Sequence, residues 1–435
     1  MKIVDEEIEQ VIREYWEREL PLVHDREIIL SLEKKFINDV VGPRRAGKTY
    51  LMFLTIKKLR EQLDKEAIIY INFENRKLLP LKESYFHSII EFVYAEELLK
   101  KYDPVYIFLD EVQRIQGWER YVRSIDDEFK GKIKVFVSGS SANLLSKEYS
   151  TLLTGRHLTT TVFPLSFQEF LRFKGVFLKD KIVTEQKKVE MEKHLKEYVQ
   201  FGGFPDVVLG HEKEAILSQL FTDIVSRDVL SRTAIRKQNL VEEFSYYLAS
   251  NVSNLLSFNK MKQYFNSRGL KISVPTLLSY FWHLKNAFLF FDSLIFSYTV
   301  KDQLQYPRKI YCVDTGIAHI AGFRMSEDYG RLVENIVAVE LLRRGFDLYY
   351  WKSRQQEEVD FVLKKGTQVN NCIQVCYEIK TVDTKQRELK ALLKAMDTFQ
   401  IRDGVIITGT LEEQHQIDNK TIHFYPLWKW LLGLT

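Results

Sequence analysis

The chain has 435 residues, of which 45% are hydrophobic and 28% are charged. This length exceeds what one hydrophobic core normally supports, and the composition is typical of globular proteins, so we expect several folded domains and little disorder. The 63 basic and 59 acidic residues nearly balance to a net charge of +4. This excludes a whole-chain electrostatic field as the basis for binding nucleic acid or an anionic membrane.

The cysteines and the N-terminal segment indicate the compartment. The three cysteines, Cys312, Cys372 and Cys376, are too few for a disulfide framework, and no Cys/His cluster has zinc-ligand spacing. Residues 1–20 are amphipathic and acidic, unlike a signal peptide, and no apolar run reaches the length of about 18 residues that a membrane span needs. We therefore expect a cytoplasmic protein that does not contact the membrane.

The first part of the chain alternates strands and helices. A helix is expected over residues 5–20, and a short apolar strand over residues 36–41 runs directly into a glycine-rich loop and a helix. Further buried strands are expected over residues 67–73, 105–111 and 133–140. Strands that alternate with helices in this way predict an α/β fold with a parallel sheet wound by crossover helices.

The glycine-rich loop matches the phosphate-binding pattern G-x-x-x-x-G-K-[ST], between a strand and a helix as the motif requires. The loop's backbone N–H groups can surround phosphate oxygens, Lys48 supplies positive charge to the outer phosphates, and Thr49 offers a hydroxyl to Mg²⁺. The alternative is a glycine-rich turn without a ligand. The predicted ligands of ATP and Mg²⁺ in this loop are Gly42, Pro43, Arg44, Arg45, Ala46, Gly47, Lys48 and Thr49.

A pair of acidic residues lies at the end of the apolar strand expected over residues 105–111. Asp110 ends that strand and Glu111 comes directly after it. A carboxylate at this position can hold Mg²⁺ through water, and the adjacent glutamate can polarise the attacking water. An Asp-Glu pair alone is a weak signal, but together with the phosphate-binding loop it predicts ATP hydrolysis, with Asp110 at the metal and with Glu111 and Lys48 as catalytic residues.

Three more residues are candidates to complete the nucleotide site. Ser140, with Ser141 beside it, follows another strand at the sheet edge where the γ-phosphate would lie, although the two serines could simply form a turn. Arg156 and Arg227 are candidates for the arginine that stabilises the transition state, supplied within one chain or by a neighbouring subunit of a homo-oligomer. Either arginine could instead be an ordinary surface residue.

Beyond residue 162 the pattern changes twice. Helical segments come first, then a helix-helix-turn-helix pattern followed by residues 288–300, which are typical of a two-stranded wing, and then a second alternating region. The expected domains are a P-loop core at 1–162, a helical lid or linker at 163–237, a winged helix at 238–307 and a smaller α/β domain at 308–435.

The chain contains a specific combination of segments: GPRRAGKT, FLDEVQRIQGWE, VSGSSANLLS, LTGR, FPLSFQEF and YVQFGGFPDVV. Over essentially its whole length it resembles the prokaryotic, largely archaeal, AAA+ ATPases that carry a winged helix and a C-terminal restriction-endonuclease-like domain. The resemblance implies a RecA-like core that uses ATP and Mg²⁺, the roles given above for Lys48, Asp110 and Glu111, and an Arg156 that completes a neighbour's site. It implies no particular substrate.

The C-terminal region resembles the opening of PD-(D/E)xK nucleases such as archaeal Holliday-junction resolvases. Glu334, Gly345 and Asp360 follow the spacing of that pattern, but the next strand carries Gln374 and Cys376 where an acidic residue and a lysine belong. Metal-dependent cleavage needs those carboxylates and that cation. We therefore expect the nuclease fold with a degenerate site at Glu334, Asp360 and Gln374. The alternative is that Glu378 and Lys380 take over through a shifted strand register.

The candidate winged helix gives little support for reading DNA bases. Its presumed recognition helix, VPTLLSYFWHLKNA, contains no arginine, and such modules also bind proteins. The leading hypothesis is an ATPase that couples hydrolysis to a conformational change of its C-terminal domains, with DNA as a candidate partner. The alternatives are an ATP-regulated DNA endonuclease and a nucleotide-dependent protein-interaction switch.

Overall fold

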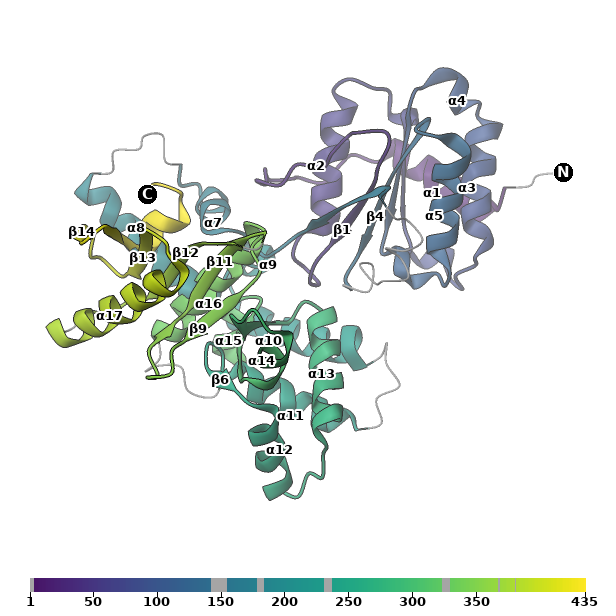
Figure 1. Cartoon of the computed structure of the whole chain (residues 1–435). Coiled ribbons are helices and arrows are strands. Elements are labelled where there is room, and N and C mark those ends of the chain that lie inside the picture. Colours follow the sequence, from purple (N-terminus) through teal and green to yellow (C-terminus); the bar gives the residue numbers. More distant parts are fainter. Residues whose placement is uncertain are drawn as a thin grey trace. The chain divides into compact units, whose positions relative to one another are not determined.

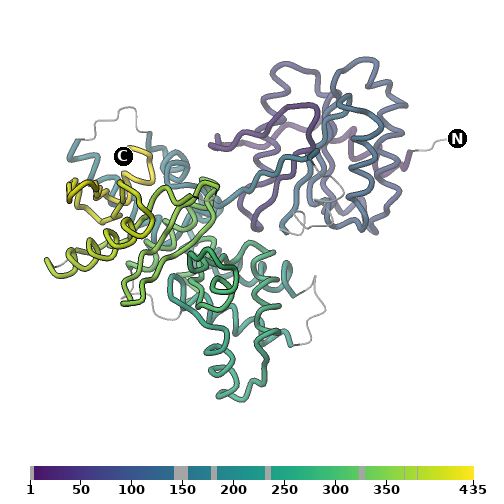
Figure 2. The backbone as a smooth tube through the Cα atoms, viewed as in Figure 1, coloured from purple at the N-terminus to yellow at the C-terminus, as the bar shows by residue number. Residues whose placement is uncertain are grey.

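The computed structural model describes residues 4–141, 155–177, 184–230, 237–322, 329–366, 368–379 and 381–435. The chain divides into two compact units, residues 1–162 and residues 163–435 (Figure 1). The backbone trace in Figure 2 shows the same division along the sequence. Each unit has sheets of its own.

The first unit is built on a sheet of five parallel strands in the order β2-β3-β4-β1-β5. The strands are β1 (Ile37–Val41), β2 (Ile68–Asn72), β3 (Val105–Asp110), β4 (Ile133–Gly139) and β5 (His157–Thr161). Every residue of β1, β3 and β4 is buried, as expected for central strands of a parallel sheet that helices cover on both faces (Figure 1).

Five α-helices accompany this sheet in the described residues of the first unit. They are α1 (Glu6–Glu17), α2 (Lys48–Arg60), α3 (Ser84–Ala95), α4 (Leu98–Lys101) and α5 (Trp118–Phe129), with short 3₁₀ turns at Lys65–Ala67, Arg76–Leu78 and Val112–Arg114. Helix α1 packs on β2 and α3 through its apolar face, which includes Tyr15 and Trp16. The indole N–H of Trp16 donates to the Ile68 carbonyl at 2.8 Å, which fixes α1 on the edge strand.

The predicted α/β fold is confirmed, and its parallel sheet is that of a RecA-like P-loop core. The four predicted strands and the N-terminal helix are present, although α1 ends at Glu17, earlier than expected. Strand β5 was not predicted, because its residues, HLTTT, are mostly polar. As an edge strand it pairs only with β1, so the sheet can accept polar side chains there.

The second unit begins with helices. They are α7 (Phe167–Phe173), α8 (Glu185–Phe201), α9 (Pro205–Leu209) and α10 (Lys213–Asp223), followed by a π-helix at Ile224–Leu230. The Gly202-Gly203 pair after α8 lies against Asp314. Gly202 has a φ of +72°, and a Cβ there would lie 1.9 Å from one carboxylate oxygen of Asp314. The Gly203 N–H donates to the other carboxylate oxygen at 2.7 Å. Both glycines are therefore required by close packing.

A helical segment with its own small sheet follows. Its elements are α11 (Gln238–Ala249), β6 (Leu255–Leu256), α12 (Phe258–Ser267), α13 (Val274–Asn286), β7 (Phe290–Ile295), α14 (Val300–Gln305) and β8 (Arg308–Cys312). The prediction of two strands within residues 288–300 is wrong, because only β7 lies there and its antiparallel partner β8 follows α14. Strand β7 also pairs in parallel with β9 (Tyr349–Lys352), so this sheet continues across residue 307.

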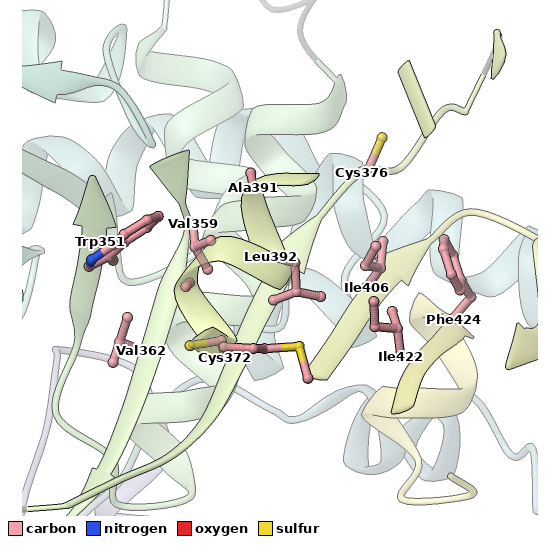
Figure 3. Close-up of a cluster of buried hydrophobic side chains, with 12 residues drawn as sticks. Trp351, Val359, Val362, Cys372, Cys376, Ala391, Leu392, Ile406, Ile422 and Phe424 are labelled. Atoms are coloured by element: carbon pink, nitrogen blue, oxygen red, sulfur yellow. The ribbon is translucent and has the colours of Figure 1, made fainter. Parts of the chain in front are cut away.

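The last part of the chain forms a mixed sheet in the order β11-β12-β13-β15-β14. Its elements and their neighbours are α15 (Thr315–Ala321), α16 (Tyr329–Arg343), β10 (Glu358–Val359), β11 (Phe361–Lys365), β12 (Gln368–Val375), α17 (Val382–Phe399), β13 (Asp403–Thr408), β14 (Glu413–Ile417), β15 (Lys420–Pro426) and α18 (Leu427–Leu431). Figure 3 shows the core between α17 and this sheet, where Leu392, Ile406 and Phe424 are buried.

Candidate functional site

The phosphate-binding loop connects β1 to α2, and its glycines are required by the geometry. Gly42 has a φ of +148°, and a Cβ there would lie 2.2 Å from the Val162 carbonyl oxygen, so no other residue fits. Gly47, with a φ of +97°, is the N-cap of α2. Arg45 also adopts a positive φ, and the Ala46 carbonyl accepts a hydrogen bond from the Arg26 guanidinium at 3.0 Å. The loop therefore holds the N-terminus of α2 open to an anion.

Lys48 lies at the start of α2 and its side chain folds back over the loop. Only 5% of the residue is exposed. The ammonium donates to the carbonyl oxygens of Gly42 and Pro43 at 3.0 and 2.9 Å. These acceptors are neutral, whereas phosphate oxygens are charged and form stronger hydrogen bonds with an ammonium. Phosphates that entered the loop would therefore compete well for this lysine.

The structure brings Asp110 and Thr49 together as predicted from the sequence. Asp110 ends β3, is fully buried, and accepts from the Thr49 hydroxyl at 2.8 Å and from the Tyr70 hydroxyl at 2.8 Å. The Asn72 amide lies 3.4 Å from the same oxygen, and the Ser138 hydroxyl donates to the other. Burial raises the pKa of Asp110, and these hydrogen bonds partly offset the rise because they stabilise the ionised form.

Glu111 is held in a defined conformation beside Asp110. Its φ is +55°, its backbone N–H donates to the Ser138 hydroxyl at 3.1 Å, and its carboxylate accepts from the Gln113 amide at 2.5 Å. Ser140 is buried at the carboxyl end of β4, as predicted, but the serine that touches both acidic residues is Ser138. A sequence signal existed for Ser138 and Asn72, since both lie near the carboxyl ends of neighbouring strands, whereas nothing in the sequence pointed to Tyr70.

The two candidate arginines lie in different places. Arg156 precedes β5, whose first residue pairs with Ile37 at the start of β1, so it lies at the amino end of the sheet, opposite the loop. Its guanidinium forms an ion pair with Asp127. Arg227 lies in the second unit, in the π-helix, and forms an ion pair with Asp223 at 3.3 Å. Arg156 therefore does not belong to the group of side chains around Asp110 and cannot reach the loop of its own chain.

In the second unit, the predicted residues Glu334 and Asp360 meet around a lysine that the sequence did not indicate. The side chain of Lys309, on β8, is 3% exposed, and its ammonium lies 3.0 Å from Glu334, 2.8 Å from Glu358 and 2.7 Å from Asp360. Tyr311 donates to the Glu334 carboxylate at 2.8 Å. Glu358 could have been found by strand alternation, because it lies two residues before Asp360, but Lys309 comes from a distant strand.

Burial and charge shift the pKa values in this cluster strongly. Burial, and then the negative charge of Asp360, raise the pKa of Glu334, while the Lys309 ammonium and the Tyr311 hydroxyl act to lower it. The surrounding carboxylates raise the pKa of Lys309 well above its ordinary value even though burial opposes this, so the ammonium stays charged. Burial also raises the pKa of Tyr311.

Gln374 and Cys376, which stand where the nuclease pattern has an acidic residue and a lysine, lie beside the cluster. The Gln374 amide accepts from the Asp360 backbone N–H at 3.2 Å and donates to Glu388 at 2.7 Å. Cys376 is buried, which raises the pKa of its thiol to about 11, so it carries no charge near neutral pH. Strand β12 ends at Val375, before Glu378, and Lys380 lies outside the described residues.

In the parts of the chain that the structure describes, no group of three or more His, Cys, Asp or Glu side chains is arranged to hold a metal ion. Over the same residues, no helix is both long and apolar enough to cross a membrane.

Three family models match the chain. Residues 34–171 match a model described as an AAA domain, residues 192–327 match a domain of unknown function, DUF8612, and residues 329–430 match another, DUF4143. The first match covers the sheet and the phosphate-binding loop described above. The chain therefore carries an AAA-type, nucleotide-binding ATPase domain.

Two solved structures resemble the chain distantly. Orc1 of Aeropyrum pernix in complex with DNA is 14% identical and has a TM-score of 0.31, over 67% of this chain and 87% of that one. DnaA of Aquifex aeolicus with bound AMPPCP is 14% identical and has a TM-score of 0.24, over 63% of this chain and 86% of that one. Similarities this low carry no function over to the chain.

Two curated proteins resemble the chain along nearly its whole length. An uncharacterized protein of Methanocaldococcus jannaschii is 34% identical over 424 residues, which cover 94% of this chain and 91% of that protein. An uncharacterized protein of Haemophilus influenzae is 31% identical over 407 residues, which cover 93% of this chain and 96% of that protein. The chain belongs to the same family as these two proteins.

Proposed function

We propose that the protein hydrolyses ATP with Mg²⁺ at the loop after β1. The observation that carries this proposal is the 2.8 Å hydrogen bond from Thr49 to Asp110, which joins the end of the phosphate-binding loop to the acidic end of β3. A hydroxyl and a carboxylate in contact are oxygen ligands suited to Mg²⁺, one directly and one through water. When bound, Mg²⁺ would neutralise charge on the outer phosphates.

The side chains of this site take separate roles in the proposed reaction. Lys48 exchanges its carbonyl acceptors for the outer phosphates, and the backbone N–H groups of Gly47 and the start of α2 bind phosphate oxygens. Glu111 accepts a proton from the attacking water. Gln113 and Ser138 hold Glu111 in place through its carboxylate and its backbone. Asp110 keeps its position through its four donors.

We further propose that Arg156 acts on the ATP site of a neighbouring subunit in a homo-oligomer. Its place at the amino end of the sheet, opposite the loop of its own chain, supports a role between subunits. Mixing Arg156→Ala with Lys48→Ala subunits would then restore some turnover through hybrid interfaces. Full turnover by a strictly monomeric protein would contradict this role.

The second unit is proposed to respond to the nucleotide state of the first. The order α11, β6, α12, α13, β7 and β8 supports a winged helix, and the order α16, β9, β10, β11, β12, α17 and β13 supports a restriction-endonuclease-like domain. The proposed divisions are at residues 162, 237 and 307, and the β7–β8 pair joins strands on either side of the last one. DNA is the candidate partner.

The experiment that tests this function is ATP turnover by the full-length protein alone and with single-stranded, duplex and branched DNA. We expect Mg²⁺-dependent turnover that one of these DNA forms changes. Turnover that no DNA changes would argue against DNA as the partner, and the absence of turnover would refute the ATPase proposal and favour the non-catalytic protein-interaction switch.

The alternative of an ATP-regulated nuclease is tested separately. We propose that the protein does not cut DNA with Mg²⁺ or Mn²⁺ in any nucleotide state, because Gln374 carries no charge and Cys376 is a protonated thiol. Incubation of plasmid and branched DNA with both metals, with and without ATP, checks this. Cleavage that disappears in Asp360→Ala would make the nuclease the better description.

A further inference from the structure

The cluster around Lys309 joins one buried ammonium to three carboxylates. Carboxylates from three places in the chain, on α16, on β10 and directly after β10, converge on one buried ammonium within 3.0 Å. The ammonium donates hydrogen bonds to Glu334 and Asp360 and forms an ion pair with Glu358. The lysine lies where the side chains of Glu334, Glu358 and Asp360 point toward a common centre.

The occupant of this centre must be a cation. Two of the three carboxylate side chains are at least 87% buried, and each would be costly to bury without a positive partner. Asp360 is also fixed on its other oxygen by the Val375 backbone N–H at 2.9 Å, so its orientation does not depend on the lysine alone. Lys352 lies 3.8 Å from Glu358 at the edge of the cluster and does not reach the other two carboxylates at its centre.

A divalent metal ion makes the same demands as this ammonium, since Mg²⁺ and Mn²⁺ prefer carboxylate oxygens around one point. In the described residues, however, no group of three or more His, Cys, Asp or Glu side chains is arranged to hold a metal ion, and the centre of these three carboxylates is occupied by the lysine. We propose that the Lys309 ammonium takes the place of a divalent metal ion, so that this carboxylate site is completed by the chain itself and is independent of metal. The proposal goes beyond ATP hydrolysis and does not depend on it.

The test uses the full-length protein without nucleotide and compares wild type with Lys309→Met, which keeps the length of the side chain and removes its charge. We expect EDTA and millimolar Mn²⁺ to leave the melting temperature of wild type unchanged. Lys309→Met removes the cation that the three carboxylates share, so its melting temperature should fall by about 10 °C, and Mn²⁺ should recover about half of that loss.

Metal binding is measured in parallel by electron paramagnetic resonance of Mn²⁺. Lys309→Met should bind Mn²⁺ that wild type does not bind, and the double variant Lys309→Met/Asp360→Asn should lose it. Mn²⁺ that remains in the double variant belongs to another site, such as the nucleotide site, and is subtracted. If Lys309→Met does not fold by itself, the proposal requires that it fold when refolded with Mn²⁺.

Three outcomes would overturn the proposal. They are Mn²⁺ binding by wild type that is lost in Asp360→Asn, an Lys309→Met protein as stable as wild type, and an Lys309→Met protein that Mn²⁺ neither binds nor stabilises. The first would show that the lysine does not fill the site. The other two would show that the carboxylates need no cation or do not form a metal-like site. Failure of ATP hydrolysis would leave each of these measurements unaffected.

Discussion

Each unit buries a lysine among oxygen atoms, but the two ammonium groups have different kinds of acceptor. Lys48 donates to two neutral backbone carbonyls of its own loop, whereas Lys309 contacts three carboxylates. A phosphate offers Lys48 a charged acceptor in place of a neutral one, and so binding gains free energy. Lys309 already has charged acceptors on all sides, so an incoming anion would be repelled and a metal cation would have to displace the lysine.

This difference in acceptors indicates under which conditions a buried lysine can bind a ligand. Both residues are nearly inaccessible, with 5% of Lys48 and 2% of Lys309 exposed, so burial does not distinguish them. What distinguishes them is the strength of the contacts that the lysine would give up. Lys48 has weaker contacts and can exchange them for those of a ligand, whereas Lys309 has stronger contacts and acts as a structural residue.

The largest expected effect comes from Lys48→Ala, which should reduce ATP turnover to background and weaken ATP binding. The outer phosphates lose the cation of the loop, which in the structure donates to the carbonyl oxygens of Gly42 and Pro43. Steady-state turnover and ATP titration check this, with Lys57→Ala, an exposed lysine of the same helix, as control. Turnover at the wild-type rate would mean that the loop is a structural turn.

Glu111→Gln should lower turnover by about 100-fold or more while ATP binding is retained. Glutamine keeps the shape of the side chain but cannot accept a proton from water. The measurement is single-turnover hydrolysis beside equilibrium ATP binding. Asp110→Ala serves as the comparison, because it should mainly change the Mg²⁺ dependence. Equal losses of binding and hydrolysis in Glu111→Gln would contradict its role as the base.

These first two predictions rest on residues that the sequence identified, because their roles depend on local order along the chain. The loop and Asp110-Glu111 each follow a buried strand, and the carboxyl ends of parallel strands meet at one sheet edge. The parts that were missed depend on pairing between distant strands. Ser138 and Tyr70 reach Asp110 only through the order β2-β3-β4, and β5 is a polar edge strand with no apolar pattern.

The site in the second unit was harder to predict for the same reason. Spacing within one segment gave Glu334 and Asp360, but Lys309 enters from β8, which reaches the cluster through a sheet shared with β7 and β9. A lysine so far away in the sequence carries no local signal. The sequence motif of the nucleases therefore lacks its cation in this chain, but the fold supplies one, Lys309, from a distant strand.

A smaller effect is expected from Tyr70→Phe, which tests whether the contacts of Asp110 matter for metal binding. The variant removes a hydroxyl that donates to Asp110 at 2.8 Å and keeps the ring that packs against Phe53. Residues behind a metal ligand typically change metal affinity by about tenfold or more, so we expect the Mg²⁺ concentration for half-maximal turnover to rise by about tenfold.

The control for this variant is Tyr106→Phe, on β3 but four residues before Asp110. ATP binding without Mg²⁺ should be unchanged in both variants. An unchanged Mg²⁺ dependence in Tyr70→Phe would show that the donors from Thr49 and Ser138 suffice to position Asp110.

The smallest expected effect concerns Asp39, a buried carboxylate whose charged partner can be switched off by pH. Asp39 lies on β1, fully buried, and the His157 ring lies 2.6 Å from it. This hydrogen bond raises the pKa of His157 above its ordinary value of about 6.5. Because the folded pKa is the higher one, the stabilisation is fully present below about pH 6.5 and is lost as the pH rises through the folded pKa.

The melting temperature of the first unit should therefore be about 2 °C lower at a pH above the folded pKa of His157 than at a pH below 6.5. This difference is counted after subtracting any change with pH that the variants also show. His157→Gln keeps a hydrogen-bonding side chain without a titrating charge and should lose this pH-dependent part. His87→Gln, at an exposed histidine of α3 that contacts Glu91, should keep it. Calorimetry across this pH range separates the variants, and identical pH profiles for wild type and His157→Gln would show that Asp39 needs no charged partner.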